Sequence, residues 1–295
     1  MAKEKIVIAK GDCHGDCSDI LYLMQSLSDR GIDLKDVVII IAGDFGIPWT
    51  GRPDSNRENL ENLNYFGCDI VALLGNHEWW NLIYSMPQGI FCGANVHQCF
   101  YDNVWYENIH YVTDPTVMTI DRKKYLLIPG ADSHDIRDGI LTGLRPIGET
   151  EEYNDWFDEF GPEIEDFAHS KYDELGYYPQ FRVEGLSWFR EEKIQIDKVC
   201  DILLDQNSFH AVVSHDAPAK FAYEFQHRCR SSIFDIYPPT DDEQRLDDIY
   251  KSIRFNRWIH GHFHEDMTSR EDSRVTISYF VPHVLSDNFQ LRKNN

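Results

Sequence analysis

The apolar residues in the first part of the chain gather in short runs, and polar residues follow each run. The runs are Ile6–Ala9, Val37–Ile41 and Asp69–Leu74, and their aliphatic composition is typical of buried strands. Segments with helical spacing separate them, one after Ser18 and one over about residues 57–66. This alternation predicts a largely parallel sheet built from β-α-β units.

A different pattern begins at about Val96. Short alternating segments at 109–112, 116–120 and 125–128 predict antiparallel strands of a second sheet, with a hairpin turn at 121–124.

The second half of the chain again alternates between helix and strand. Residues 186–204 predict a long helix before the strand His210–Val213. Residues 241–253 predict a helix before the strand Arg257–Ile259, and Val275–Val281 predicts a further strand.

We expect one domain over residues 1–295 with two irregular segments in it. Residues 136–184 form an insertion, because Glu149–Glu174 is dense in acids and interleaved with aromatic residues. A disordered acidic linker would have few aromatic residues, so the insertion is expected to pack on the body. A solvated helical surface is the alternative. Residues 219–239 predict an irregular loop that is a candidate cap over a site.

Charge and composition narrow the function classes. The formal net charge of −22 disfavours broad binding to nucleic acid or anionic membranes, which both need basic surface. Seven cysteines without a Cys-x-x-Cys pair argue against a disulfide framework or a thiolate zinc site. The N-terminus has no signal-like apolar stretch, and no apolar run approaches the ~20 residues that span a bilayer. We therefore expect a cytoplasmic protein.

Five predicted strands end in side chains that can bind metal ions. In chain order these are Asp12 and His14, Asp44, Asn76 and His77, His215, and His262 and His264. In α/β folds, the loops after the carboxyl ends of parallel strands meet and form a site. Carboxylate, amide and imidazole groups together suit manganese, iron, zinc or nickel.

Without His77 this set has seven members, more than one tetrahedral ion requires. Two ions that share a bridging carboxylate would use all seven. Such a pair, about 3.5–4 Å apart, forms the clamp used for in-line displacement at phosphorus. Two divalent ions would outweigh the charges of Asp12 and Asp44, so the site would attract phosphate.

The ordered motifs Asp-x-His, Gly-Asp, Gly-Asn-His-Glu, His and Gly-His-x-His run from Gly11 to His264. This set resembles the calcineurin-like metallophosphoesterase superfamily. The resemblance implies an α/β fold in which a two-sheet mixed β-sandwich is flanked by helices in four layers. It implies that Asp12, His14 and His264 bind one metal ion, that Asp44 bridges, and that Asn76, His215 and His262 bind the other.

The resemblance also implies a reaction. A metal-bridging hydroxide would attack the phosphorus of a phosphomonoester or phosphodiester. His77 would face the substrate and either steady the transition state or protonate the leaving oxygen.

The chain departs from the serine/threonine protein phosphatases of this superfamily. Those enzymes follow the bridging Asp with a Val-Asp-Arg-Gly-like run, whereas Phe45–Trp49 follows Asp44 here. The missing Asp would orient the catalytic His, and the missing Arg would bind phosphate. The chain therefore looks like bacterial members of the superfamily, and the group that orients His77 stays open.

Two further groups of residues are candidates for substrate contact. Arg228 and Arg230 lie in the only basic cluster near a motif and could recognise an extra phosphate or a nucleotide. Solvated surface charge is the alternative. The stretch Ser133–Asp135 either lines the pocket or forms a plain loop.

We therefore expect a phosphatase or phosphodiesterase with two divalent ions, manganese first and iron, zinc or nickel as alternatives. Its substrate would be a small phosphorylated molecule, with nucleotides among the candidates. We expect no membrane partner and specify no oligomeric state. A metal-dependent nuclease and a non-catalytic interaction scaffold on the same fold are the alternatives, and the net charge counts against the nuclease.

Overall fold

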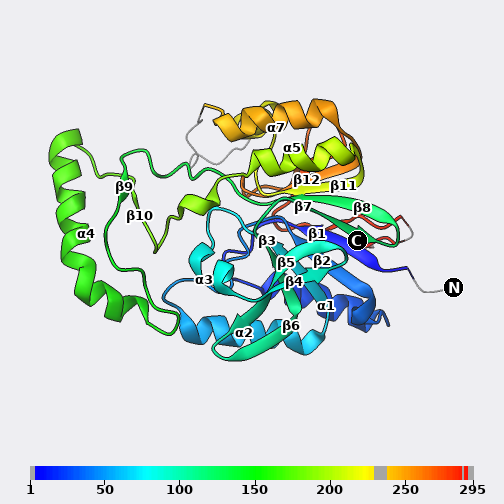
Figure 1. The fold of residues 1–295 in the computed structure, drawn as a ribbon, viewed down its shortest axis with the longest axis horizontal. Coiled ribbons are helices and arrows are strands. Elements are labelled where there is room, and N and C mark those ends of the chain that lie inside the picture. Colours follow the sequence, from blue (N-terminus) through cyan, green and yellow to red (C-terminus); the bar gives the residue numbers. More distant parts are fainter. Residues whose placement is uncertain (1–3, 229–237, 288, 292–295) are drawn as a thin grey trace.

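Two β-sheets packed face to face form the centre of the molecule (Figure 1). The computed structural model describes residues 4–228, 238–287 and 289–291. Side chains such as Val7 and Ile40 of one sheet meet Val213 and Ile259 of the other in an apolar layer between them. Burial of this layer removes apolar surface from water and holds the two sheets together.

The first sheet carries the predicted β-α-β units. Its strands, in spatial order, are β15 (His283–Val284), β1 (Ile6–Lys10), β2 (Val37–Ile41), β3 (Asp69–Leu73), β6 (Val104–Val112), β5 (Ala94–Tyr101) and β4 (Gln88–Phe91). Strands β1, β2, β3 and β6 are parallel, so the three predicted apolar runs lie side by side.

The second sheet has a parallel centre of the same kind. Its strands, in spatial order, are β13 (Met267–Thr268), β14 (Val275–Ile277), β12 (Arg254–His260), β11 (Ser208–Ser214), β8 (Lys123–Ile128) and β7 (Thr116–Ile120). The predicted hairpin joins β7 to β8, and its turn residues Asp121 and Arg122 have positive φ.

One sequence prediction about the sheets is wrong. Strands β5 and β6 lie in the first sheet, where β6 pairs in parallel with β3, and only β7 and β8 enter the second. Ile109 and Tyr111 of β6 are buried in the core under the first sheet. Local alternation identifies a strand and its neighbour in the hairpin, but it does not identify the sheet that the pair joins.

Helices cover the outer face of each sheet. The first sheet packs on α1 (Ser18–Asp29), α2 (Pro53–Phe66) and α3 (Trp80–Ser85), and the 3₁₀ turn η1 (Leu34–Asp36) precedes β2. The second packs on α5 (Ile196–Asp205), α6 (Ala219–Arg228) and α7 (Asp241–Ser252). The order helix, sheet, sheet, helix confirms the predicted four-layer α/β sandwich (Figure 1).

The long helix predicted over 186–204 is wrong in its first half. Only α5 and the 3₁₀ turn η2 (Arg190–Glu192) are helical in this segment. Leu186 packs in the core of the first sheet, whereas Val199 packs in the core of the second. The segment crosses from one layer to the other, so a straight helix could not bury both of its ends.

The prediction of an irregular loop over 219–239 is also wrong in its first half. Residues Ala219–Arg228 form α6, which buries Phe221 and Phe225 under the second sheet. Residues 229–237, and with them Arg230, lie outside the described part of the chain.

The acidic insertion contains a long helix between two short strands. Strands β9 (Ile140–Leu141) and β10 (Arg182–Val183) pair in parallel, and α4 (Tyr153–Leu175) stands at one side of the molecule (Figure 1). The Tyr153 amide donates to the Gly51 carbonyl at 3.1 Å, which ties the start of α4 to the body. Within the described residues, no helix combines the length and apolarity that crossing a membrane requires.

Candidate metal centre

The ends of strands from both sheets supply the predicted metal ligands. Asp12, Asp44 and Asn76 follow β1, β2 and β3, and His215 and His262 follow β11 and β12. Four of the predicted ligands have left-handed backbone conformations: His14, Asp44, His262 and His264. Such a conformation costs a residue with a side chain on the order of 1–3 kcal/mol, and it is typical of functional sites.

One half of the centre is a compact group of carboxylates and imidazoles. The ligand atoms of Asp12, His14, Asp44 and His264 all lie within 4.8 Å of one another. His14 Nε2 and His264 Nε2 are 2.8 Å apart, and His264 Nε2 is 3.3 Å from Asp12 Oδ2. These atoms surround a space in which a cation could bind several donors at once.

The other half gathers around His215. Its Nε2 lies 3.1 Å from Asn76 Oδ1 and 3.3 Å from Asp44 Oδ1, and the His262 ring packs against it with centroids 4.9 Å apart. His215 Nδ1 lies 2.8 Å from the Ala42 carbonyl, to which it donates. That contact turns Nε2 toward the centre, as outer hydrogen bonds commonly do for metal-binding histidines.

The geometry of these side chains suits a divalent metal ion. Asp44 Oδ2 and His262 Nε2 are buried and have no hydrogen-bond partner among the described residues. A buried polar atom without a partner costs about 1–3 kcal/mol. A cation between these two atoms would remove that cost, and carboxylate, amide and imidazole donors suit first-row divalent ions.

The ionisation of the centre follows from burial and from the opposed charges in it. Burial disfavours a charged Asp44, yet His215 and His77 hold the pKa of its carboxyl well below the usual range. Burial disfavours a charged His215 too, but Asp44 and Asp12 raise its pKa to about 10. Burial lowers the pKa of His262 well below its usual range, so this imidazole is neutral and has a lone pair to donate.

His77 lies at the edge of this centre. Its amide donates to Asp44 Oδ1 at 2.8 Å, and its ring stacks on Trp49 with centroids 5.9 Å apart. Its Nε2 lies 2.8 Å from Nη2 of Arg182. Burial, aided by the charge of Arg182, lowers the pKa of His77 to about 4 although Asp44 acts in the opposite direction.

A pocket of about 310 Å³ opens beside His77. Its lining combines aromatic, aliphatic and polar side chains: Trp49, Thr50, His77, Glu78, Trp79, Asp135, Phe181, Arg182, Leu186 and Ser187. The body of the fold supplies one wall, and the insertion with the segment after it supplies the other. This volume is at the lower end of the range for small-molecule sites.

Two residues near the site have positions that the sequence analysis did not assign. Glu78 accepts hydrogen bonds from the amides of Phe45 at 2.6 Å and Gly46 at 3.1 Å, so it shapes the loop after Asp44. Arg182 lies in a segment without clear periodicity, and no local signal connected it to the motif at His77. Arg182 pairs with Asp135, which belongs to the stretch Ser133–Asp135. The sequence analysis left open whether this stretch lines the pocket or forms a plain loop, and Asp135 lines the pocket.

The predicted substrate contact of Arg228 stays a prediction. Its Nη1 pairs with Glu224 Oε1 at 2.5 Å and donates to the Thr268 carbonyl at 3.0 Å. Arg230 lies outside the described residues.

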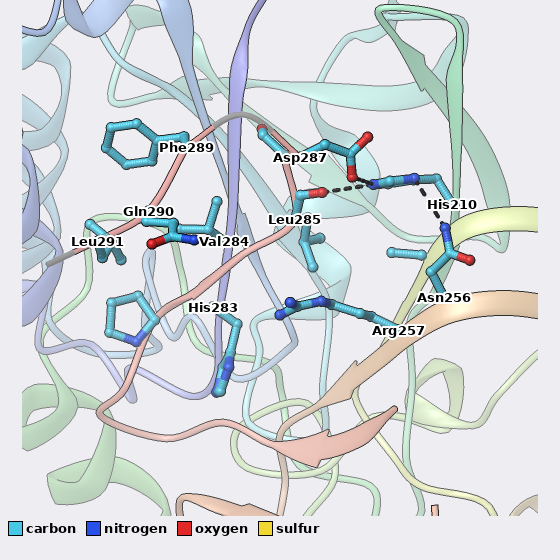
Figure 2. A pocket seen from close by; sticks show the side chains of 13 residues that line it. His210, Asn256, Arg257, His283, Val284, Leu285, Asp287, Phe289, Gln290 and Leu291 are labelled. Carbon is cyan, nitrogen blue, oxygen red and sulfur yellow. Dashed lines mark hydrogen bonds and ion pairs between the residues drawn. The ribbon is translucent and has the colours of Figure 1, made fainter. Parts of the chain in front are cut away.

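Figure 2 shows a second cavity, of about 840 Å³. His210 and Arg257 line it from β11 and β12, several residues before the ends of those strands, and the C-terminal segment forms its other side. Figure 2 shows Asp287 and the Leu285 carbonyl against His210. No predicted site residue lines this cavity.

The chain is similar to known proteins at the level of family and of solved structures. The model of the calcineurin-like phosphoesterase family matches residues 7–266. A search of curated proteins finds no match.

Two solved structures illustrate the similarity. TT1561 of Thermus thermophilus is 12% identical, with a TM-score of 0.39 over 94% of this chain and 91% of that one. A dimetal phosphatase from Danio rerio is 12% identical, with a TM-score of 0.41 over 94% of this chain and 88% of that one.

Proposed function

The chain belongs to the calcineurin-like phosphoesterase family, and we propose that it hydrolyses a small phosphoester at a centre of two divalent metal ions. The observation that carries the proposal is the convergence of seven potential ligands at one edge of the two sheets. Two atoms of this set, Asp44 Oδ2 and His262 Nε2, are buried without a hydrogen-bond partner among the described residues. Without a cation at this place, the two buried atoms would destabilise the fold, because nothing would replace the hydrogen bonds that they make to water in the unfolded chain.

Each metal position has its own group of side chains. Asp12, His14 and His264 would hold one ion, Asn76, His215 and His262 would hold the other, and Asp44 would bridge them. Manganese is the ion we expect, with iron, zinc or nickel as alternatives. The ions would supply positive charge for the phosphoryl oxygens and an activated water as nucleophile.

The pocket beside His77 would accept the part of the substrate that leaves. A phosphoryl group bound at the predicted metal ligands would have its leaving oxygen near His77, whose ring borders the pocket. Trp49, Trp79 and Phe181 line it, so a planar group such as a nucleobase would find aromatic surface there. The site therefore favours a monoester or diester with an aromatic leaving group.

The test is a panel of phosphoesters assayed after chelation and after return of Mn²⁺. The panel contains nitrophenyl mono- and diesters, cyclic nucleotides, dinucleoside polyphosphates and oligonucleotides. We expect metal-dependent hydrolysis of a small ester. Cleavage of oligonucleotides alone would identify a nuclease, and no hydrolysis with two bound ions would identify a scaffold.

Two variants assign the activity to this site. Asp44→Asn should lose metal and turnover together, because it weakens the ligand shared by both ions. His77→Ala should keep its metal content but lose turnover by about 100- to 1,000-fold, the usual cost of removing one hydrogen-bond donor to the transition state. Normal turnover of His77→Ala with full metal content would remove His77 from the reaction.

A further inference from the structure

Arg182 is a buried arginine that the insertion brings to the active-site histidine. It lies on β10, and its residue is 5% exposed. Nη1 donates to the carbonyls of Asn76 at 2.9 Å and Ser187 at 3.0 Å. Nη2 lies 2.8 Å from His77 Nε2, and Nε lies 2.6 Å from Asp135 Oδ1.

These contacts fix the guanidinium rather than leave it free to move. Two carbonyls, one carboxylate and one imidazole surround a planar group whose N–H bonds point in set directions. One of the carbonyls belongs to Asn76, the residue before His77 in the motif. Arg182 therefore contacts both the backbone carbonyl of Asn76 and the side-chain ring of His77.

The chemistry of arginine decides which atom donates. A guanidinium has no acceptor and stays protonated in proteins, so Arg182 donates and His77 Nε2 accepts. A neutral imidazole with an accepting Nε2 carries its proton on Nδ1. The contact thus selects one of the two tautomers of His77.

We propose that Arg182 is the positioning residue of His77, holding its ring as the Nδ1–H tautomer so that Nδ1 is the nitrogen that meets the substrate. This inference rests on the proposed function for its catalytic meaning. It gives the insertion a part in the active site. Arg182 stands in the orienting role that an Asp has in the protein phosphatase branch.

The tautomer also decides between the two roles considered for His77, which are protonation of the leaving oxygen and stabilisation of the transition state. A neutral imidazole that released its Nδ1 proton while Nε2 accepts from Arg182 would become an imidazolate, which is a high-energy species. Donation of a hydrogen bond from Nδ1–H to a phosphoryl or leaving-group oxygen needs no such step. His77 therefore acts as a hydrogen-bond donor that steadies the transition state.

The direct test is the nitrogen NMR spectrum of the protein labelled with ¹⁵N-histidine and loaded with zinc, which is diamagnetic. The His77→Ala variant identifies the His77 signals by their loss. We expect an Nδ1–H tautomer in the wild type and loss of that preference in Arg182→Met. A wild-type spectrum with the proton on Nε2, or an unchanged spectrum in Arg182→Met, would overturn the inference.

Kinetics give the second readout. In Arg182→Met we expect kcat to fall by about 100-fold, as for other losses of positioning, with KM and metal content little changed. Arg182→Lys should keep part of the rate. Added methylguanidinium should rescue Arg182→Ala, whereas methylammonium should rescue it less. An unchanged kcat in Arg182→Met also counts against the proposal.

A matched control lies in the same insertion. Arg145 is exposed and pairs with Glu151 and Glu159, so Arg145→Met removes a comparable charge without touching His77. It should leave both the spectrum and kcat unchanged. If Arg182→Met does not fold, Arg182→Lys and the wild-type spectrum decide.

Failure of the proposed function has a different result. A wild type that hydrolyses no phosphoester refutes the function, while its spectrum still decides the tautomer. A wild type that hydrolyses phosphoesters, with an Arg182→Met variant as fast, refutes only the inference.

Discussion

At the scale of single residues, glycines decide how closely the ligands approach. A Cβ added to Gly261 would lie 2.1 Å from Asp12 Oδ1, and one added to Gly75 would lie 2.2 Å from Asp44 Oδ1. Real Cβ atoms essentially never come within 3.0 Å of another heavy atom. These two glycines therefore have a packing role in the motifs, because each leaves room for a carboxylate that would bind metal.

Gly261→Ala should weaken metal binding, and the backbone at Ala42 must also shift, because the new Cβ would lie 2.8 Å from the Ala42 carbonyl oxygen. Asp12 must move away from the new methyl group, so we expect the affinity for Mn²⁺ to fall by about 10- to 100-fold, as when outer partners of ligands are lost. Titration calorimetry measures it. Gly148→Ala is the control, because its Cβ would make only ordinary contacts, the nearest at 3.4 Å. Equal affinity in the two variants would contradict the packing role.

Glu192→Gln should change how stability depends on pH. Burial raises the pKa of Glu192 to about 7, above its ordinary value of 4.5. The folded state therefore holds a proton that the unfolded state releases between these values. Over this window the group lowers the free energy of unfolding by up to about 1.4 kcal/mol per pH unit as pH rises. Gln cannot ionise, so the variant should gain stability over wild type between pH 5 and pH 8.

Urea unfolding at the two pH values measures this difference. The neighbouring Glu191 is exposed, so Glu191→Gln is the control and should show no such gain. A Glu192→Gln variant whose stability follows the wild type at both pH values would show that Glu192 ionises normally in the folded protein.

At the scale of elements, two helices that cover the second sheet, α5 and α7, are stabilised in different ways. Helix α7 begins with a capping box, in which the Glu243 amide donates to the Thr240 hydroxyl at 3.1 Å and the Thr240 amide donates to Glu243 Oε2 at 2.8 Å. Helix α5 lacks a side-chain cap and packs by its apolar face. The capping box therefore fixes the start of α7 at Asp241.

Thr240→Ala should destabilise the protein by about 1 kcal/mol, the usual cost of losing an N-cap hydrogen bond. Thr240→Ser keeps the hydroxyl and should recover most of this loss. Chemical denaturation of both variants measures it, and turnover per folded molecule should match the wild type. A loss as large in Ser as in Ala would indicate a packing role for the threonine methyl instead.

At the scale of the whole molecule, the candidate metal centre takes its side chains from both sheets. Asp12, Asp44 and Asn76 come from the first sheet, and His215 and His262 come from the second. The site therefore forms only when the sheets are docked through their shared apolar layer. An ion that binds residues of both sheets stabilises this docked state.

Chelation should lower the melting temperature, and return of Mn²⁺ should restore it. A ligand at 100 times its Kd stabilises a folded protein by about 2.7 kcal/mol, which corresponds to a shift of about 4 °C for a chain of this length. Calorimetry with and without chelator measures the shift. Asp44→Asn is the control, because it removes the shared ligand and should melt at nearly the same temperature in both conditions. Equal melting of the wild type in both would contradict a metal that joins the sheets.

Prediction from sequence succeeded where a signal is local. The strands β1, β2 and β3 were predicted within a residue or so, because aliphatic runs bounded by polar breaks need no partner to be recognised. The convergence of the predicted ligands followed from one rule, that parallel strands end at the same edge. The placement of β5 and β6 failed, because the sheet that a hairpin joins depends on packing far along the chain.

The sequence by itself determined the family and predicted the ligand types and their order along the strands, because motifs at strand ends are short and contiguous. Only the tertiary structure decided what lies against His77. Arg182 is 105 residues away along the chain, in an insertion without regular periodicity, and it meets His77 only because β10 packs beside the motif. A contact between distant segments is set by the packing of the whole fold, and no local pattern in the chain encodes it.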